Sequence, residues 1–346
     1  MSPTSRGTAA ISKDGQPLLA FTFFGVFVEI SMCAWGLSSG LSLWLTPFVL
    51  AHFHAGYILA PKAERCRWFP AGSLAATGMV ILGASVIGNW WMLSCVALLL
   101  FSTSLQVLRR RLKGSVRLKS AWKNICKALA MLAGSAGALP AGAFAVVLWS
   151  VGLVVVCLSV QVHRNRREEP REQAPPSNRA LLWFEGLHHA HYFAYVYVFW
   201  ALLTPSLRAW LGPFFVVGWL GYFLMERLLR EERGKFRIHH MIIGHIVCAG
   251  AIAAMLSNSS VAVVLLLWFV TGAAGGTAYM LDRCQNGGNR ELFEDSGHII
   301  GCLAAALGLL VCDRVEIPLL TASAFAVAAA AVLVFAGFGH EKETSL

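Results

Sequence analysis

Long apolar stretches separated by short polar gaps run through almost the whole chain. Because a helix needs roughly 20 apolar residues to cross the hydrocarbon core of a bilayer, this pattern predicts about twelve membrane-spanning helices. The gaps are too short for a folded domain outside the membrane, so the predicted fold class is an all-α polytopic membrane protein. The predicted spans cover residues 18–36, 41–60, 71–88, 90–108, 120–137, 140–162, 180–203, 210–228, 238–256, 260–281, 296–312 and 317–338.

Lysine and arginine occupy alternate gaps. All 28 of them except Arg208 and Arg314 fall in or near one set of gaps, which also includes both chain termini. Cytoplasmic loops retain these residues because their translocation is unfavourable. The charge pattern therefore predicts a multi-pass protein of a bacterial-type inner membrane, with the lipid bilayer as its partner and both termini in the cytoplasm.

The composition excludes several other classes of protein. Hydrophobic residues make up 57% and charged residues 13% of the chain, against roughly 25% charged residues in soluble proteins. The net charge of +10 lies mainly in loops between spans, where membrane insertion explains it, so no nucleic acid partner is expected. No Gly-x-x-x-x-Gly-Lys-Ser/Thr motif occurs, which argues against an ATP-driven pump.

The most polar gap divides the predicted spans into two blocks of six. It holds Arg-Glu pairs followed by Pro175 and Pro176, a composition typical of a linker. We therefore predict an N-terminal six-helix half over residues 1–162, a cytoplasmic linker over 163–179 and a C-terminal six-helix half over 180–346.

A short repeat indicates that the two halves are copies of each other. The second span contains Gly56-Tyr57-Ile58-Leu59, and the eighth contains Gly221-Tyr222-Phe223-Leu224, each preceded by a Pro-Phe pair. Six spans place both halves in the same orientation, so the repeat axis is expected along the membrane normal.

Twelve spans, cytoplasmic termini, a basic central loop and two parallel halves together resemble the major facilitator superfamily. Members of this family usually carry a Gly-x-x-x-Asp-Arg-x-Gly-Arg-Arg loop after the second span. Here that segment begins at Gly56 and continues Pro61-Lys62-Ala63-Glu64-Arg65, keeping the glycine and basic residues but not the acid at its usual place. The copy after the eighth span has the pair Glu226-Arg227 one position late.

The resemblance implies a monomeric secondary transporter, and no enzyme, that works by alternating access. Its two halves would tilt about a site near the middle of the membrane, lined by the first, fourth, seventh and tenth spans. The expected substrate is a small polar or metal-chelating molecule. By analogy, export coupled to proton entry, which is antiport, is favoured over import.

Ionisable side chains inside a bilayer are unfavourable and usually face a protein cavity. Glu29 is the only acid deep within an apolar stretch of the N-terminal half. Because apolar surroundings favour the neutral acid over the carboxylate, Glu29 is a candidate for loading and releasing a proton. A carboxylate held by a neighbouring hydroxyl or Trp N–H is the structural alternative.

The seventh span opens with a group of polar residues at helical spacing. Residues three or four positions apart are neighbours on the surface of a helix, so these side chains form a polar stripe along adjacent faces of a predicted cavity helix. We predict proton coupling through Glu29, Glu185 and His188. We predict substrate contacts from His188, His189, His191, Tyr192, Tyr195 and His52.

Other histidines extend this inventory. His52 and His54 are two positions apart and point to nearly opposite sides of a helix, so at most one faces the cavity. Imidazoles also suit transition metals, and the sequence does not separate proton relay from metal binding. No resident cofactor is expected, and a metal ion or chelate would be a substrate. The candidate metal ligands are His188, His191, His245 and His298.

A histidine-rich membrane metalloenzyme, similar to the desaturases and hydroxylases, is the alternative function. Those enzymes hold two irons near the cytoplasmic face with HxxxH and HxxHH boxes. This chain instead has HxH, HHxH and HHxxxxH spacings, and its short gaps leave no cytoplasmic cap. Both features favour the transporter.

Overall fold

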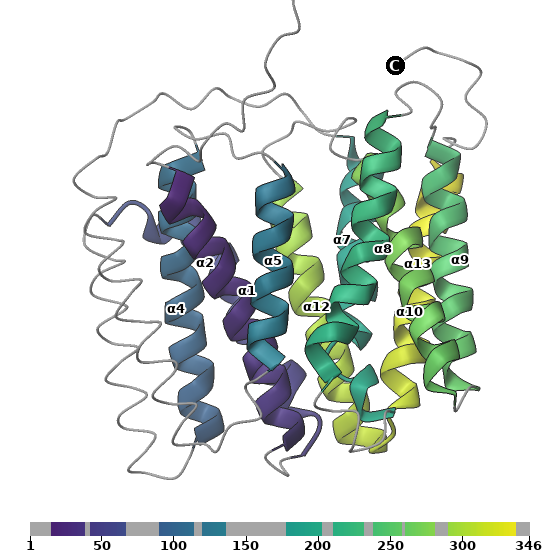
Figure 1. Ribbon diagram of the computed structural model, residues 1–346, viewed down its shortest axis with the longest axis horizontal. Helices are drawn as coiled ribbons and strands as arrows, with labels where there is room; N and C mark the ends of the chain where they lie inside the picture. Colours follow the sequence, from purple (N-terminus) through teal and green to yellow (C-terminus); the bar gives the residue numbers. More distant parts are fainter. Residues whose placement is uncertain are drawn as a thin grey trace, which may run out of the picture.

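The computed structural model is a bundle of long helices lying side by side (Figure 1). It describes residues 15–38, 42–66, 90–113, 120–135, 178–202, 210–231, 238–257, 260–280 and 290–336, and these ranges contain no strand. The helices are α1 (Gly15–Ser38), α2 (Leu45–Ala63), α4 (Trp90–Lys113), α5 (Ser120–Ser135), α7 (Arg179–Tyr195), α8 (Leu211–Glu231), α9 (Ile238–Leu256), α10 (Val261–Gly275), α12 (Arg290–Cys312) and α13 (Glu316–Phe335). Two 3₁₀ helices, η1 (Phe199–Leu202) and η3 (Gly276–Met280), extend α7 and α10.

Each predicted span within the described residues coincides with one of these helices. The third and sixth predicted spans and nearly all of the linker over 163–179 lie outside the described residues, so the count of twelve and the division into halves stay predictions. Within the described ranges, five helices are long and apolar enough, by length and composition, to cross a bilayer. They run over Gln16–Gly36, Ile238–Leu256, Val261–Tyr279, Arg290–Cys312 and Glu316–Phe335.

The packing of the helices follows the predicted repeat. In the N-terminal half, here α1 to α5, α1 packs on α5 and α2 packs on α4. In the C-terminal half, here α7 to α13, the corresponding pairs are α7 with α12 and α8 with α10. The two halves meet where α2 packs on α12 and α5 on α8, which again are corresponding pairs (Figure 1). Equivalent elements therefore have equivalent neighbours.

The two repeated glycines permit close helix contacts at corresponding places, between α2 and α4 and between α8 and α10. A Cβ atom added to Gly56 of α2 would lie 2.7 Å from the backbone nitrogen of Thr103 and 2.8 Å from the carbonyl of Leu99, both in α4. A Cβ atom at Gly221 of α8 would lie 2.9 Å from the nitrogen of Ala273 and would also meet the carbonyl of Phe269, both in α10. Only a glycine fits at either crossing.

This geometry predicts that Gly56→Ala lowers stability. The added methyl must push α2 away from the α4 backbone, and overpacking of this kind costs about 1–3 kcal/mol. Gly250→Ala in α9 is the matched control, because its Cβ would meet nothing within 4 Å, and alanine is the better helix former. Thermal unfolding in detergent should show a lower Tm for Gly56→Ala and an unchanged or higher Tm for Gly250→Ala. Equal Tm values for the two variants would contradict the packing argument.

Ion pairs join the two halves at the end of the bundle where α2 and α4 end and α12 begins. The guanidinium of Arg110 in α4 lies 3.4 Å from the carboxylate of Glu64, just after α2, and donates to the carboxylate of Glu291 in α12. The adjacent Arg111 donates to the carbonyls of Glu64 and Cys66. Glu64 thus supplies an acid at this end, although the sequence lacks one at the usual position of the family loop.

Candidate functional site

The polar residues of α7 point in two directions. A helix turns about 100° per residue, so Glu185 and His189 share one face while His188, His191 and Tyr195 share another. The first face packs toward α12, where Gly186 and His189 contact Gly297. The second packs toward α9, where His188 and His191 contact the ring of His245. The polar stripe predicted along adjacent faces of this helix thus divides into two groups, one on each face.

A first chain of hydrogen bonds crosses between the two halves. The hydroxyl of Tyr197, which follows α7, donates to Oε1 of Glu29 in α1. The same hydroxyl lies 3.0 Å from Nε2 of His54 in α2. A residue of the C-terminal half thus lies between two ionisable residues of the N-terminal half, and His54 and Tyr197 are each about 1% exposed.

The number of protons that each side chain can donate determines which group donates at each step of this chain of hydrogen bonds. A tyrosine hydroxyl has one proton to donate, and a carboxylate only accepts. When Glu29 is ionised, Tyr197 donates to it, and the Nε2–H of His54 donates to the tyrosine oxygen. The Nδ1 of a neutral His54 then carries no proton, and among the described residues it has no hydrogen-bond partner.

A break in the seventh span turns Tyr197 toward the N-terminal half. The α-helix ends at Tyr195, residues 196–198 form a turn, and η1 follows. The carbonyls freed by this break are satisfied, because Trp200 Nε1 donates to Val196 at 2.6 Å and the Cys33 thiol donates to Tyr197 at 3.6 Å. Irregular backbone at membrane depth is tolerated where it is buried in protein, and residues 196–200 are buried.

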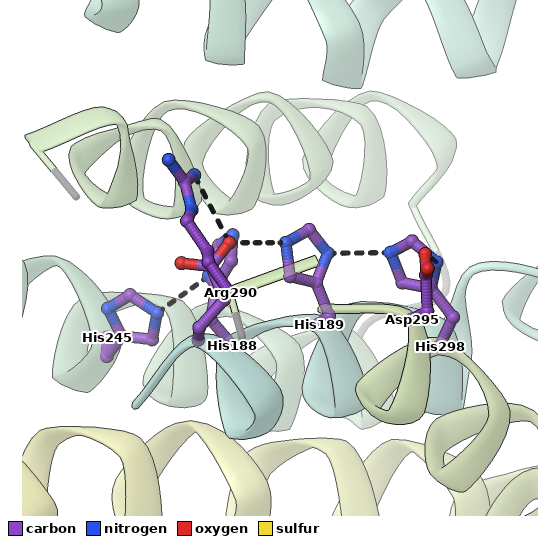
Figure 2. A network of polar contacts seen from close by, with 7 residues as sticks. His188, His189, His245, Arg290, Asp295 and His298 are labelled. Carbon is purple, nitrogen blue, oxygen red and sulfur yellow. Dashed lines mark hydrogen bonds and ion pairs between the residues drawn. The ribbon is translucent and has the colours of Figure 1, made fainter. Parts of the chain in front are cut away.

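A second chain runs within the C-terminal half (Figure 2). The carboxylate of Glu185 accepts from Arg290 of α12 at 3.3 Å and from Nε2 of His189 at 3.3 Å. Nδ1 of His189 then lies 2.9 Å from Nε2 of His298 in α12. The carboxylate of Asp295 lies near the other nitrogen of His298. Its distance of 4.0 Å from Nδ1 of His298 is too long for a hydrogen bond.

The two chains meet at His54 and His298. Their rings lie edge to face with centroids 4.9 Å apart, and Phe193 packs against both. His54 belongs to the N-terminal half and His298 to the C-terminal half, so this ring contact spans the interface between α2 and α12. The first chain ends on the carboxylate of Glu29, and the second leads through the carboxylate of Glu185 to Arg290.

A third group, the histidine trio, consists of His188, His191 and His245. One ligand atom from each lies within 4.8 Å of the others, and all three residues are buried. Ligand atoms of His189, Glu294 and His298 are equally close together. In that second set, however, His189 and Glu294 are only half-buried, whereas all three histidines of the trio are buried. The trio is therefore the more enclosed of the two groups.

The remaining predicted contact residues are placed as follows. Tyr195 is 1% exposed, stacks on His191 and packs edge to face against Trp268, next to the trio. Tyr192 packs against Tyr195 and Phe193 between the two faces of α7. The role of His52 stays a prediction. Its Nδ1 hydrogen-bonds the carbonyl of Phe48 in its own helix at 3.0 Å, and the residue that joins the network is His54.

The four candidate metal ligands lie in two groups. His188, His191 and His245 lie together, while His298 lies with His189 and Glu294. The sequence pattern missed Arg290 because the eleventh span was expected to begin at residue 296, whereas α12 begins at Arg290. Glu291 in the first turn of α12 favours this earlier start, since acidic residues stabilise helix N-termini.

Comparison with known structures shows which fold this is. The chain is similar to a bacterial metal transporter, with a TM-score of 0.63 and 14% identity over 96% of this chain and 100% of the other. It is also similar to a bacterial homologue of the human lysosomal transporter Spinster, with a TM-score of 0.60 and 16% identity over 92% of this chain and 96% of the other. It is similar as well to a POT-family transporter, with a TM-score of 0.65 and 8% identity over 96% of this chain and 100% of the other. The chain has the fold of these membrane transporters.

No family model matches the chain, and no curated protein matches it in sequence.

Proposed function

We propose that this protein is a divergent secondary transporter of the major facilitator type, which moves a small polar or metal-chelating molecule by alternating access. Proton-coupled export across a bacterial-type inner membrane, by a monomer with cytoplasmic termini, is the working form of this proposal. The transporter fold supports it. The observation that carries it is the chain from Glu29 through Tyr197 to His54, because this chain places a titratable carboxylate at the contact between the two halves.

A proton on Glu29 would change what His54 offers to a substrate. When Glu29 is protonated, it donates to the Tyr197 oxygen, and the tyrosine hydroxyl must then donate to Nε2 of His54. The imidazole proton then resides on Nδ1. The free Nδ1 of His54 thus changes from an acceptor to a donor. Proton binding at Glu29 is thereby linked to substrate binding beside His54 and His298.

The metalloenzyme alternative gains no support from the arrangement of the histidines. Among the described residues they are divided between the two chains and the trio, and they do not gather around one two-iron centre. The transporter is therefore the function that the geometry supports best.

Alternating access can be tested by distance measurements between spin labels. Leu59 of α2 and Leu228 of α8 are 42% and 44% exposed, and their helices end at the same end of the bundle. Labelled at these two sites after replacement of other reactive cysteines, the reconstituted protein should show two distance populations. Their ratio should change between about pH 5 and pH 8, the range in which a tuned carboxylate or histidine titrates.

A label pair within one half is the control for this experiment. Leu228 of α8 and Ile243 of α9 are both exposed residues of the C-terminal half. Because each half is expected to move as a unit, their distance should stay constant over the same pH range. One narrow, pH-independent distance between Leu59 and Leu228 would contradict alternating access driven by proton binding.

The ion pairs at this end of the bundle give a further prediction. Arg110→Glu places like charges opposite both Glu64 and Glu291, so the Leu59–Leu228 distance should lengthen. Adding Glu291→Arg to Arg110→Glu restores an attractive pair between α4 and α12 and should bring the shorter distance back. The same spin-label measurement reads both results. An Arg110→Glu variant with the wild-type distance would mean that these ion pairs do not hold the halves together.

A further inference from the structure

The histidine trio is a compact, buried group of nitrogen donors inside the C-terminal half. His188 and His191 lie one turn apart on α7, and the ring of His245 in α9 contacts both. Figure 2 shows the contact between His188 and His245. Their exposed fractions are 7%, 1% and 0%. Three imidazoles from two packed helices, with ligand atoms within 4.8 Å of one another, are within reach of a single ion.

The tautomer of His245 is set by its backbone partner. Its Nδ1 lies 2.8 Å from the carbonyl of Met241, and a carbonyl only accepts, so Nδ1 carries the proton. Nε2 is therefore unprotonated and accepts a hydrogen bond from Nδ1 of His188 at 2.9 Å. An ion bound to Nε2 would take the place of this hydrogen bond. Metal-binding histidines are typically oriented in this way, by a hydrogen bond from the other ring nitrogen to a carbonyl or carboxylate.

A thiol lies beside the trio. Cys248 is one turn after His245 on α9 and is fully buried. Its Sγ lies 3.4 Å from Nε2 of His191 and 3.8 Å from the carbonyl of Thr271 in α10. Thiols lose their proton when they bind a metal. Cys248 is therefore positioned to supply a negative charge next to the three neutral imidazoles.

One polar atom of the trio has no partner among the described residues. Nδ1 of His191 is buried and makes no hydrogen bond. An unsatisfied buried group of this kind costs about 1–3 kcal/mol, and a bound ion is one of the features that explain such groups in folded proteins.

We propose that His188, His191 and His245 bind one divalent first-row transition-metal ion. Imidazole and thiolate donors select ions such as Zn²⁺, Co²⁺ or Ni²⁺ over Mg²⁺ and Ca²⁺. The site goes beyond the proposed transport function, because it lies between α7, α9 and α10 within one half and not at the contact of the two halves. An ion bound there fastens α7 to α9.

Equilibrium binding to the purified full-length protein tests this site. The protein is stripped with a chelator, freed of any affinity tag and dialysed against radioactive Zn²⁺ in the presence of excess Mg²⁺. The wild type should retain one zinc ion per chain. His245→Gln and His191→Gln should each weaken zinc binding by more than the roughly 10–100-fold loss that follows removal of an outer-shell partner. Co²⁺ should give visible absorption bands in the wild type that both variants lack.

His52→Gln is the matched control. Within the described part of the chain, the hydrogen bond of His52 is to the carbonyl of Phe48 in its own helix, away from the trio. It should bind zinc as the wild type does. Two ligand variants on different helices are used so that a folding defect in one leaves the other informative, and Tm without metal identifies such a defect. A wild type that holds zinc no more tightly than a folded His245→Gln or His191→Gln variant would overturn the proposal. Since binding is measured without transport, failure here would leave the proposed function untouched.

Discussion

Glu29→Gln is expected to abolish gradient-driven accumulation of substrate while leaving exchange of substrate across the membrane intact. A gradient of one pH unit stores about 1.4 kcal/mol per proton, which supports about a tenfold concentration ratio for a carrier that couples one proton to one substrate. Glutamine keeps an oxygen that accepts from Tyr197 but cannot take up or release a proton. The ratio reached by the variant should therefore fall to about one.

The measurement is uptake into proteoliposomes with and without an imposed pH gradient. Radiolabelled small polar solutes and metal chelates are first screened with the wild type, and the solute that accumulates is then used for the variants. Tyr197→Phe should uncouple transport in the same way, because it removes the hydroxyl between Glu29 and His54. Glu316→Gln, at an exposed helix start, should accumulate substrate normally. Full gradient dependence in Glu29→Gln would exclude Glu29 as the coupling residue.

Glu185→Leu is expected to cause the largest loss of stability of any single substitution in the second chain. Glu185 is 1% exposed and accepts from both Arg290 and His189. Removing one member of a buried ion pair costs about 3–5 kcal/mol, because the partner's charge is left uncompensated. We expect the lower end, about 3 kcal/mol, since the Arg290 side chain is 24% exposed and partly hydrated.

Thermal unfolding in detergent measures this loss as a lower Tm. The exposed pair of Arg314 and Glu316 provides the control, since its side chains are 67% and 43% exposed and solvent screens their attraction. Glu316→Leu should leave the Tm unchanged. A Glu185→Leu variant as stable as the wild type would show that the Glu185 carboxylate is not the anchor of the second chain.

The helices could be predicted from the sequence because the bilayer imposes a length and a polarity on each of them. The eighth and ninth spans, for example, were expected over 210–228 and 238–256, and the structure has Leu211–Glu231 and Ile238–Leu256. The repeat was also visible, since Gly56 and Gly221 occupy corresponding helix crossings. Both features depend on local composition or on a motif, which a single sequence displays directly.

The connections within the site could not be predicted from the sequence, because they depend on contacts between distant helices and on a local break. On an uninterrupted helix Tyr197 would lie away from both polar faces of α7, and the turn after Tyr195 is what brings it to Glu29. Likewise, helical spacing shows that His52 and His54 diverge, but only the packing of α2 against α12 decides that His54 joins the network.

His188 and His189 are neighbours in sequence, yet one faces α9 and the other α12. A rotation of α7 about its own axis would therefore disturb both groups in the same movement. Thermodynamic reciprocity then applies: if occupancy of one side of α7 alters the affinity of the other, the reverse effect must have the same size. Binding at the α9 side of α7 and binding at the α12 side would then be coupled through rotation of this one helix. The two binding events would compete or cooperate according to the orientation that each one favours.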